Sequence, residues 1–267
     1  MTADGAWFAA AGPVPDLFEA ALRLGHCDRP AADLSDYRAH LAELAREAGA
    51  AGATTATERL EALIAVLAGK NGYRGDAETY DDLANANLLD VIDRRRGLPV
   101  ALGILYIATA RAAGWQMEGL AFPHHFLVRL TAGSERAILD PFAGAAVDGA
   151  AGLRAILHRL AGAEAKLEPS HTAPAADRTI LIRLINNQRL RLLSAGRREA
   201  ALAVVERMLW LAPSDPTLAA EAAQIEVALG RIGGAIRRLE ALSLSIDDAQ
   251  LKRRIDADIQ RLRTRLN

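Results

Sequence analysis

The segment Gly97–Gly114 reads GLPVALGILYIATARAAG and decides how the rest of the chain can be interpreted. Pro99 stands where a helix would begin. Proline suits the first helical position, because its fixed φ is helical and its missing amide proton would have no partner there. The following residues leave little polar face, which is typical of a central helix. Gly103 costs this helix about 1 kcal/mol relative to alanine, so we expect another backbone to pack closely against it. The segment predicts a buried helix over Pro99–Ala113.

Beyond this helix the chain changes to strand character. Met117–Phe122 is a predicted strand, and a hairpin turn is expected at Thr131–Glu135. One face of the strand before that turn is apolar and consists of Phe126, Val128 and Leu130. Because side chains alternate across a strand, this pattern places His124 on the apolar face and His125 on the opposite face with Arg129. We therefore interpret His124 as a structural residue and His125 as the better candidate for a cleft.

Pro99, His125 and Asp140 follow one another in the order and spacing of a Cys–His–Asp acyl-transfer site. In such a site the cysteine lies at a helix N-terminus, where the helix dipole and a nearby imidazole lower its pKa. A carboxylate behind the histidine fixes the orientation of the ring. Proline has no nucleophilic atom. The sequence therefore predicts that the fold of such a site is present but that the nucleophile, and with it acyl transfer, is missing.

Asp140 has a second interpretation, which stays open beside the first. Asp-Pro at the end of a strand often begins a turn in which the aspartate side chain accepts from the backbone two residues on. A His–Asp pair without a thiol could position a ligand or simply stiffen the sheet.

Three motifs resemble the SirB1 family of bacterial proteins. They are NLLDVIDRRRGLPVAL at Asn87–Leu102, PHHFLVR at Pro123–Arg129 and LDPF at Leu139–Phe142. The resemblance covers roughly residues 30–160 and continues more weakly through the tail. It implies a transglutaminase-like fold followed by a tetratricopeptide-like tail, and it carries no activity over to this chain.

The transglutaminase-like pattern can be laid on this sequence residue by residue. It implies that Pro99 occupies the position of the nucleophilic cysteine and that Arg111 is the arginine at the end of that helix. His125 and Asp140 take the positions of the catalytic histidine and aspartate. His124 departs from the pattern, which more often has a small residue there. The departure at Pro99 argues against transglutaminase or protease activity.

Composition narrows the class of protein. The chain has 267 residues, of which 51% are apolar, and a formal net charge of -1 with acids and bases interspersed. Two domains are a reasonable expectation at this length, and nothing favours a nucleic-acid or membrane partner. The basic run Arg94–Arg96 is interpreted as cations at a helix end. The longest apolar run, Leu98–Ala110, is shorter than the ~20 residues that span a bilayer.

The cysteine and histidine content predicts neither a metal nor a cofactor. Cys27 is the single cysteine, so internal disulfides and cysteine-based metal clusters are excluded. His124 and His125 are adjacent and would point to opposite faces of a strand, which does not suit a metal site. The N-terminus has an acid where a secretion signal would carry basic residues. We expect a cytoplasmic protein.

The tail contains an internal repeat. Gly196 and Gly230 lie 34 residues apart, and the apolar positions that follow them match at the same offset: Ala201 with Ala235, Leu202 with Ile236, Val205 with Leu239, and Met208 with Leu242. This period resembles tetratricopeptide repeats, which bind peptides or proteins. Glu168–Thr179 is interpreted as a linker before the repeats. Asn187, near their start, is a candidate for a polar binding surface.

These observations predict an α+β fold: an N-terminal arm over 1–30, a transglutaminase-like domain with a small antiparallel sheet over 31–168, and all-α repeats over 178–267. The leading hypothesis is a non-catalytic adaptor or regulator with a protein or peptide partner. One alternative is a hydrolase or acyl transferase that uses His125 and Asp140 with another nucleophile, such as Cys27. The other is a small-ligand regulator that uses the vestigial cleft. The candidate binding residues are Arg96, Pro99, His124, His125, Asp140 and Asn187.

Overall fold

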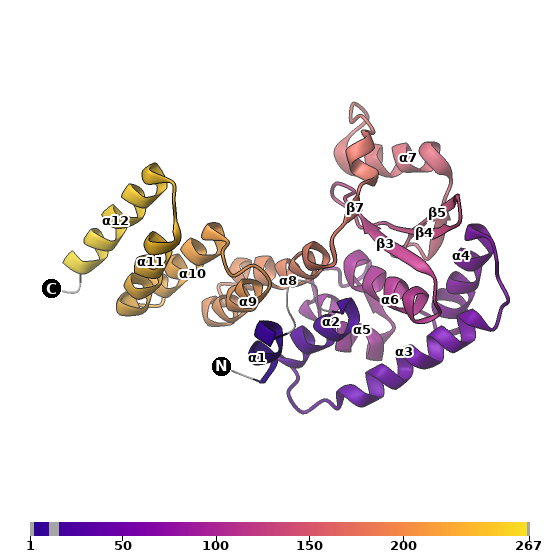
Figure 1. The fold of residues 1–267 in the computed structure, drawn as a ribbon, viewed down its shortest axis with the longest axis horizontal. Helices are drawn as coiled ribbons and strands as arrows, with labels where there is room; N and C mark the ends of the chain where they lie inside the picture. Colours follow the sequence, from indigo (N-terminus) through magenta and orange to yellow (C-terminus); the bar gives the residue numbers. More distant parts are fainter. Residues whose placement is uncertain (1–2, 11–15, 266–267) are drawn as a thin grey trace. The chain divides into compact units, whose positions relative to one another are not determined.

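The structure is a computed structural model that describes residues 3–10 and 16–265 (Figure 1). The chain forms two compact units. We name Ala11–Leu184 the sheet unit, and Met1–Ala10 together with Ile185–Asn267 the helical unit. The expected arm over 1–30 is divided between them, because helix α1 (Ala3–Ala10) falls in the helical unit and the next helix in the sheet unit. The expected boundary near 168–178 also lies elsewhere, since helix α8 (Asp177–Ser194) runs through the division.

The sheet unit combines helices with a five-stranded antiparallel sheet in the order β6-β5-β4-β3-β7. Its helices are α2 (Leu17–His26), α3 (Leu34–Gly49), α4 (Ala56–Ile64), η1 (Ala65–Lys70), η2 (Leu83–Ala86), α5 (Leu88–Arg94), α6 (Pro99–Ala112), α7 (Gly149–Ala161) and η3 (Pro169–Thr172). The strands of the sheet are β3 (Gln116–Leu120), β4 (Val128–Ala132), β5 (Glu135–Asp140), β6 (Ala145–Val147) and β7 (Pro174–Ala175). A separate parallel pair joins β1 (Arg74–Gly75) to β2 (Arg96–Gly97).

Side chains at the helix N-termini explain where several helices begin. Asp16, Asp33 and Asn87 accept from backbone amides of the first turns of α2, α3 and α5, which satisfies groups that the helix itself leaves unpaired. Thr55 and Glu58 form a capping box at the start of α4. Helix α6 has no such side-chain cap and begins with proline instead.

Helix α6 is the centre of the sheet unit, as predicted. All of its residues from Pro99 to Ala110 are buried, and it packs against β3 and β4 of the sheet and against α3 (Figure 1). The opposite face of the sheet is covered by α7, through a cluster that consists of Leu120, Phe122, Leu127, Leu153 and Leu157. The sheet is therefore the middle layer between α6 and α7.

The glycine of α6 lies against an aromatic ring, not against another backbone as expected. A Cβ at Gly103 would overlap the ring of Phe126, 2.5 Å from its Cδ1. A Cβ at Gly119, in β3, would lie 2.6 Å from Cζ of the same ring. Phe126 is 1% exposed. The two glycines thus make the space that this ring fills between the helix and the sheet.

Two helical glycines are expected to respond to alanine in opposite directions. Gly103→Ala should lower the free energy of unfolding by about 1–3 kcal/mol, because the added methyl group overpacks the core against Phe126. Gly233→Ala in α11 (Ile232–Ser245) meets only Arg237 Nη1 at 3.6 Å and should raise it by about 0.5–1 kcal/mol through helix propensity. Urea unfolding monitored by circular dichroism measures both. A stabilising Gly103→Ala would contradict the packing described here.

The predicted alternation holds in β4 but not before it. Val128 and Leu130 are buried and Arg129 between them is half-buried, and the hairpin turn connects β4 to β5 as expected. The strand begins at Val128, however, and the histidines precede it in a turn where His124 has a φ of 59°. His124 is exposed and His125 is buried, so the interpretation of His124 as the core residue was wrong.

A glycine-rich segment and the predicted linker are both structured. Tyr73 and Asp76, within the glycine-rich stretch after η1, are buried next to β1. The predicted linker begins with η3 and then supplies β7, which pairs with β3 at the edge of the sheet. Helix α5 ends in a left-handed conformation at Arg95, with a φ of 58°, and Gly97 is part of β2.

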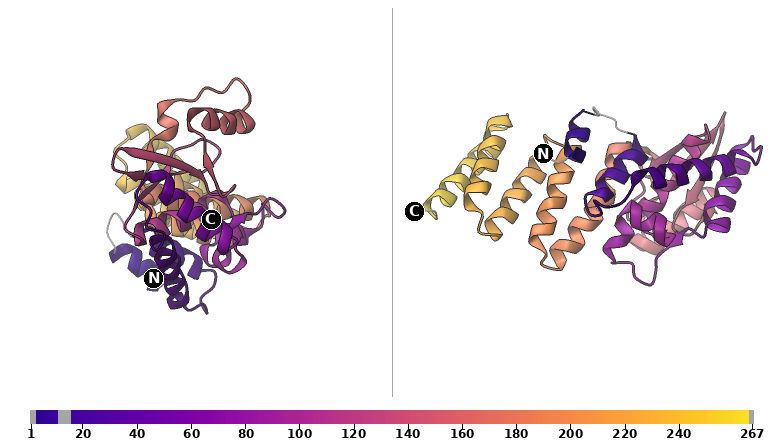
Figure 2. Two further views of the ribbon diagram at one scale, coloured as in Figure 1. Left: turned by 90° about the vertical axis from the view of Figure 1, so that its right-hand side faces the viewer. Right: turned by 90° about the horizontal axis from the view of Figure 1, so that it is seen from below.

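The helical unit contains an array of four helices, α9 to α12, in which each packs on the next (Figure 2). After α8 it contains α9 (Arg198–Leu211), α10 (Pro216–Ala228), α11 (Ile232–Ser245) and α12 (Ala249–Thr264). The apolar positions that repeat every 34 residues are all buried in α9 and α11, so the repeat is confirmed as a repeat of packing. Helix α1 joins this unit through Phe8, whose ring stacks on that of Trp210 at 5.7 Å.

No described helix is both long enough and apolar enough to cross a bilayer.

Candidate functional site

The structure brings His125 and Asp140 together. His125 lies in the turn that precedes β4, and Asp140 is the last residue of β5, the strand paired with β4. The Nε2 atom of His125 is 2.9 Å from Oδ1 of Asp140. The contact is close but is not a well-aligned hydrogen bond. His125 is 9% exposed and Asp140 is 5% exposed. The order of the residues along the chain therefore predicted a real pair.

Asp140 also forms the Asp-Pro turn that the sequence offered as the second interpretation of this residue. Its Oδ1 accepts from the amides of Phe142 at 2.9 Å and Ala143 at 3.3 Å. The same carboxylate thus holds the histidine and the chain that follows it. The two interpretations of Asp140 are compatible, and both are present.

The electrostatic environment keeps the Asp140 carboxyl ionised. Burial acts to raise its pKa, but His125 and the amides of Ala143 and Phe142 outweigh burial and hold the pKa below its usual value. A lowered carboxyl pKa means that the ionised form is more stable in the folded protein than in the unfolded chain. The pair therefore contributes to folding stability at neutral pH.

The pair is enclosed by neighbouring side chains. The ring of Phe142 meets the His125 ring edge-on, with centroids 6.4 Å apart, and Tyr80 meets Phe142 at 6.0 Å. Behind the histidine, Nη2 of Arg183 donates to the His125 carbonyl at 2.5 Å. Phe142 and Arg183 thus lie on two sides of the buried histidine.

Pro99 is buried at the first position of α6. Backbone hydrogen bonds hold the two residues that precede Pro99. The Leu98 amide donates to the Asn85 carbonyl at 3.0 Å, and the Gly97 carbonyl accepts from the Asp76 amide at 3.2 Å. The amide of Gly75 donates to the carbonyl of Phe142 at 3.0 Å. Through these bonds the segment before α6 is tied to the turn that follows Asp140.

The carboxylate of Asp76 organises that segment. It accepts from the Thr79 hydroxyl at 2.6 Å and from Arg94 at 3.2 Å, and Arg96 lies 3.8 Å away. Hydrogen bonds from Thr79, with a further contribution from Asn85 and Arg96, lower the pKa of Asp76 to about 2. Arg94 and Arg96 are thus partners of a buried carboxylate, a role that differs from the predicted one of cations at a helix end.

The remaining candidates do not join the His125–Asp140 pair. Arg111 forms an ion pair with Asp177 at 2.5 Å. The Sγ atom of Cys27 donates to the Arg23 carbonyl at the end of α2. Asn187 belongs to the helical unit, where its side chain accepts from Arg191 at 3.2 Å.

Sequence reasoning missed Asp76, Asn85 and Arg183. Asn85 is fully buried and donates to the Thr79 carbonyl at 2.6 Å. A polar residue between loop residues gives no sign of such burial. Arg183 lies far along the chain from His125, and only the tertiary fold brings the two together. Phe142 ends the motif LDPF, only two residues after Asp140, and this closeness in sequence could have indicated that it lies near the pair.

Concave sites exist elsewhere in each unit. A pocket of about 760 Å³ lies beside β5 and α7, where Arg136, Ile138 and Leu153 are among its lining residues. A groove of about 670 Å³ lies between α10 and α12 of the helical unit. Across 3–10 and 16–265, no three His, Cys, Asp or Glu side chains gather in a way that could hold a metal ion.

Two known protein families match this chain, one over most of the sheet unit and one over most of the helical unit. The profile of the Transglutaminase-like superfamily matches residues 35–186, more than half of the chain. The chain belongs to the Transglutaminase-like superfamily. A second profile, Tetratricopeptide repeat, matches residues 188–267. This confirms the predicted order of a transglutaminase-like α+β domain followed by a helical repeat region.

Curated relatives of this transglutaminase-like chain share part of its length. A UPF0162 protein of Xylella fastidiosa (strain Temecula1) is 33% identical over 174 residues, which cover 64% of this chain and 62% of that protein. A UPF0162 protein of Vibrio cholerae is 36% identical over 146 residues, 54% of each. The F-box only protein 21 of Mus musculus is 37% identical over 70 residues, 26% of this chain and 11% of that protein. The chain thus spans less than two thirds of the length of these relatives. No solved structure matches it.

Proposed function

We propose that this transglutaminase-like protein is a non-catalytic, cytoplasmic adaptor whose helical unit binds a protein or peptide partner. The observation that carries the proposal is the buried state of the site. Pro99 begins α6, and the His125–Asp140 pair is enclosed by Phe142. A thiol site needs a nucleophile at that helix start and an imidazole open to substrate.

The repeat region supports the binding half of the proposal. Tetratricopeptide repeats are generally protein-interaction modules, and the match extends over residues 188–267. Stacked helix pairs present extended grooves to a partner, and the groove between α10 and α12 is such a surface. In this proposal the transglutaminase-like domain is a scaffold and recognition belongs to the helices.

The two alternative functions have less support. A hydrolase or acyl transferase that used Cys27 would need the thiol beside His125, whereas the thiol donates to Arg23 at the end of α2. A small-ligand regulator would need an open space around His125 and Asp140, and both side chains are buried.

The proposal is tested by looking for a covalent intermediate on the full chain. The purified protein is incubated with a glutamine-donor peptide, a peptide thioester and a fluorescent amine, and intact-mass spectrometry follows each mixture. We expect no acylated protein and no amine incorporation above a heat-denatured control. A Cys27→Ala control removes the single thiol. An acyl adduct that forms on the folded chain and not on the heat-denatured control would overturn the proposal, and its loss in Cys27→Ala would make Cys27 the nucleophile.

A further inference from the structure

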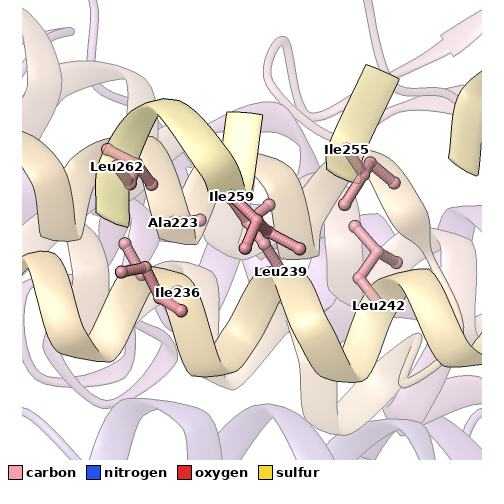
Figure 3. Close-up of a cluster of buried hydrophobic side chains, with 8 residues drawn as sticks. Ala223, Ile236, Leu239, Leu242, Ile255, Ile259 and Leu262 are labelled. Carbon is pink, nitrogen blue, oxygen red and sulfur yellow. The ribbon is translucent and has the colours of Figure 1, made fainter. Parts of the chain in front are cut away.

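The groove between α10 and α12, which we call the α10–α12 groove, opens from the core of the helical unit. Helix α11 packs on both α10 and α12 and forms its floor. The side chains that form this core include Ala223, Leu239, Ile255 and Leu262 (Figure 3). All four also line the groove. The groove therefore continues an apolar core outward to the surface.

Each side wall of the groove is one helix face. The wall on α10 carries no charge and consists of Ala220, Ala223, Gln224 and Val227. The wall on α12 consists of Leu251, Arg254, Ile255, Asp258, Arg261 and Leu262, together with Arg265, which directly follows the helix. These α12 positions follow one another at helical spacing, so they form one continuous stripe. At 1.5 Å of rise per residue the stripe is about 20 Å long.

The charges on this stripe are unbalanced. Three arginines line it with a single acid, Asp258, and that acid is already paired with Arg261. Arg254 and Arg265 are exposed. Arg254 has a weak electrostatic interaction with Asp248, whose carboxylate is held mainly by the amides of Leu251 and Gln250. The groove therefore combines an apolar floor with positive charge along one rim.

We infer that the α10–α12 groove binds an acidic, amphipathic helical segment of a partner protein. Its apolar side chains would lie on Val227, Leu251 and Ile255, and its carboxylates would face Arg254 and Arg265. A helix inserted between two helices with its apolar face inward is a recurrent mode of peptide recognition. Charge complementarity at such a rim sets which partners are accepted. This inference rests on the proposed function and specifies the chemistry of the partner.

The test uses the full chain and two synthetic peptides as long as α12. Both carry leucines at helical spacing, with glutamates on the polar face of one and lysines on the polar face of the other. Fluorescence anisotropy measures the dissociation constants. We expect the glutamate peptide to bind at least about tenfold more tightly than the lysine peptide, with a preference that weakens as salt is added.

Charge reversal locates the binding. Arg254→Glu combined with Arg265→Glu should weaken binding of the glutamate peptide by about tenfold or more. Arg253→Glu is the matched control, because Arg253 is an exposed arginine of the same helix that does not line the groove. It should change the dissociation constant by less than about twofold. Circular dichroism checks that each variant is folded.

Other results would separate this inference from the proposed function. Equal affinity for both peptides, or equal effects of the Arg254/Arg265 and Arg253 variants, would overturn the inference alone. So would binding of phosphatidylserine vesicles without binding of either peptide. A dimer that is lost on reversal of Arg254 and Arg265 would assign the groove to a second copy of the chain instead. The adaptor proposal would fail separately, through the acyl adduct described above.

Discussion

Replacing Phe126 with alanine is expected to lower the free energy of unfolding of the sheet unit by about 3–5 kcal/mol. The ring is 1% exposed and fills the space left by Gly103 in α6 and Gly119 in β3. Its removal leaves a cavity between the central helix and the sheet, and the surrounding structure can collapse only in part. The loss is a large fraction of the 5–15 kcal/mol that stabilises a typical domain.

Urea unfolding monitored by circular dichroism and tryptophan fluorescence measures this effect. Leu244→Ala is the control, because Leu244 is 84% exposed and should change the free energy by no more than about 0.5 kcal/mol. A cost below about 1 kcal/mol for Phe126→Ala would mean that the ring does not separate α6 from β3.

Replacing His125 with alanine is the second large effect that we expect. It removes the imidazole that lies 2.9 Å from Asp140 and leaves the buried carboxylate without the side chain that faces it. Leaving a buried polar group without its partner costs about 1–3 kcal/mol, and the lost packing of the ring adds to this. In a catalytic site the same substitution would abolish activity with little effect on folding. Urea unfolding of His125→Ala measures this effect. A lower free energy of unfolding is expected for a pair whose role is structural, and an unchanged one would contradict that role.

Variants at Asp140 separate its two roles. Asp140→Asn keeps an oxygen for the amides of Phe142 and Ala143 but removes the charge, whereas Asp140→Ala removes both. Because the pKa of Asp140 is lowered in the folded state, its contribution is present above the unfolded carboxyl pKa of about 3.9 and is lost as pH falls through the folded pKa. The acid limb of a stability–pH curve should therefore flatten in Asp140→Asn. An unchanged acid limb would contradict the assignment.

The sequence predicted those parts of the fold that depend on local pattern. The extent of α6 follows from its uniform apolar character and Pro99, and the buried positions of α9 and α11 follow from the 34-residue repeat. The His125–Asp140 pair could be inferred from residue order, because adjacent antiparallel strands bring their ends together.

Other features depended on tertiary contacts that no local pattern records. His124 could not be placed by strand alternation, because the chain turns at that residue before β4 starts. Pro174 lies within the predicted linker, yet it pairs with Leu120 as part of β7. The carbonyl of His125 finds its donor in Arg183, on a helix much later in the chain.

The position of Pro174 has a consequence for how copies of this protein behave at high concentration. An outermost strand normally presents free backbone donors to any neighbouring chain, and this is a common route to aggregation. Proline has no such donor, and β7 is only two residues long. The protein therefore offers a poor template for intermolecular strand pairing on the β7 side of its sheet.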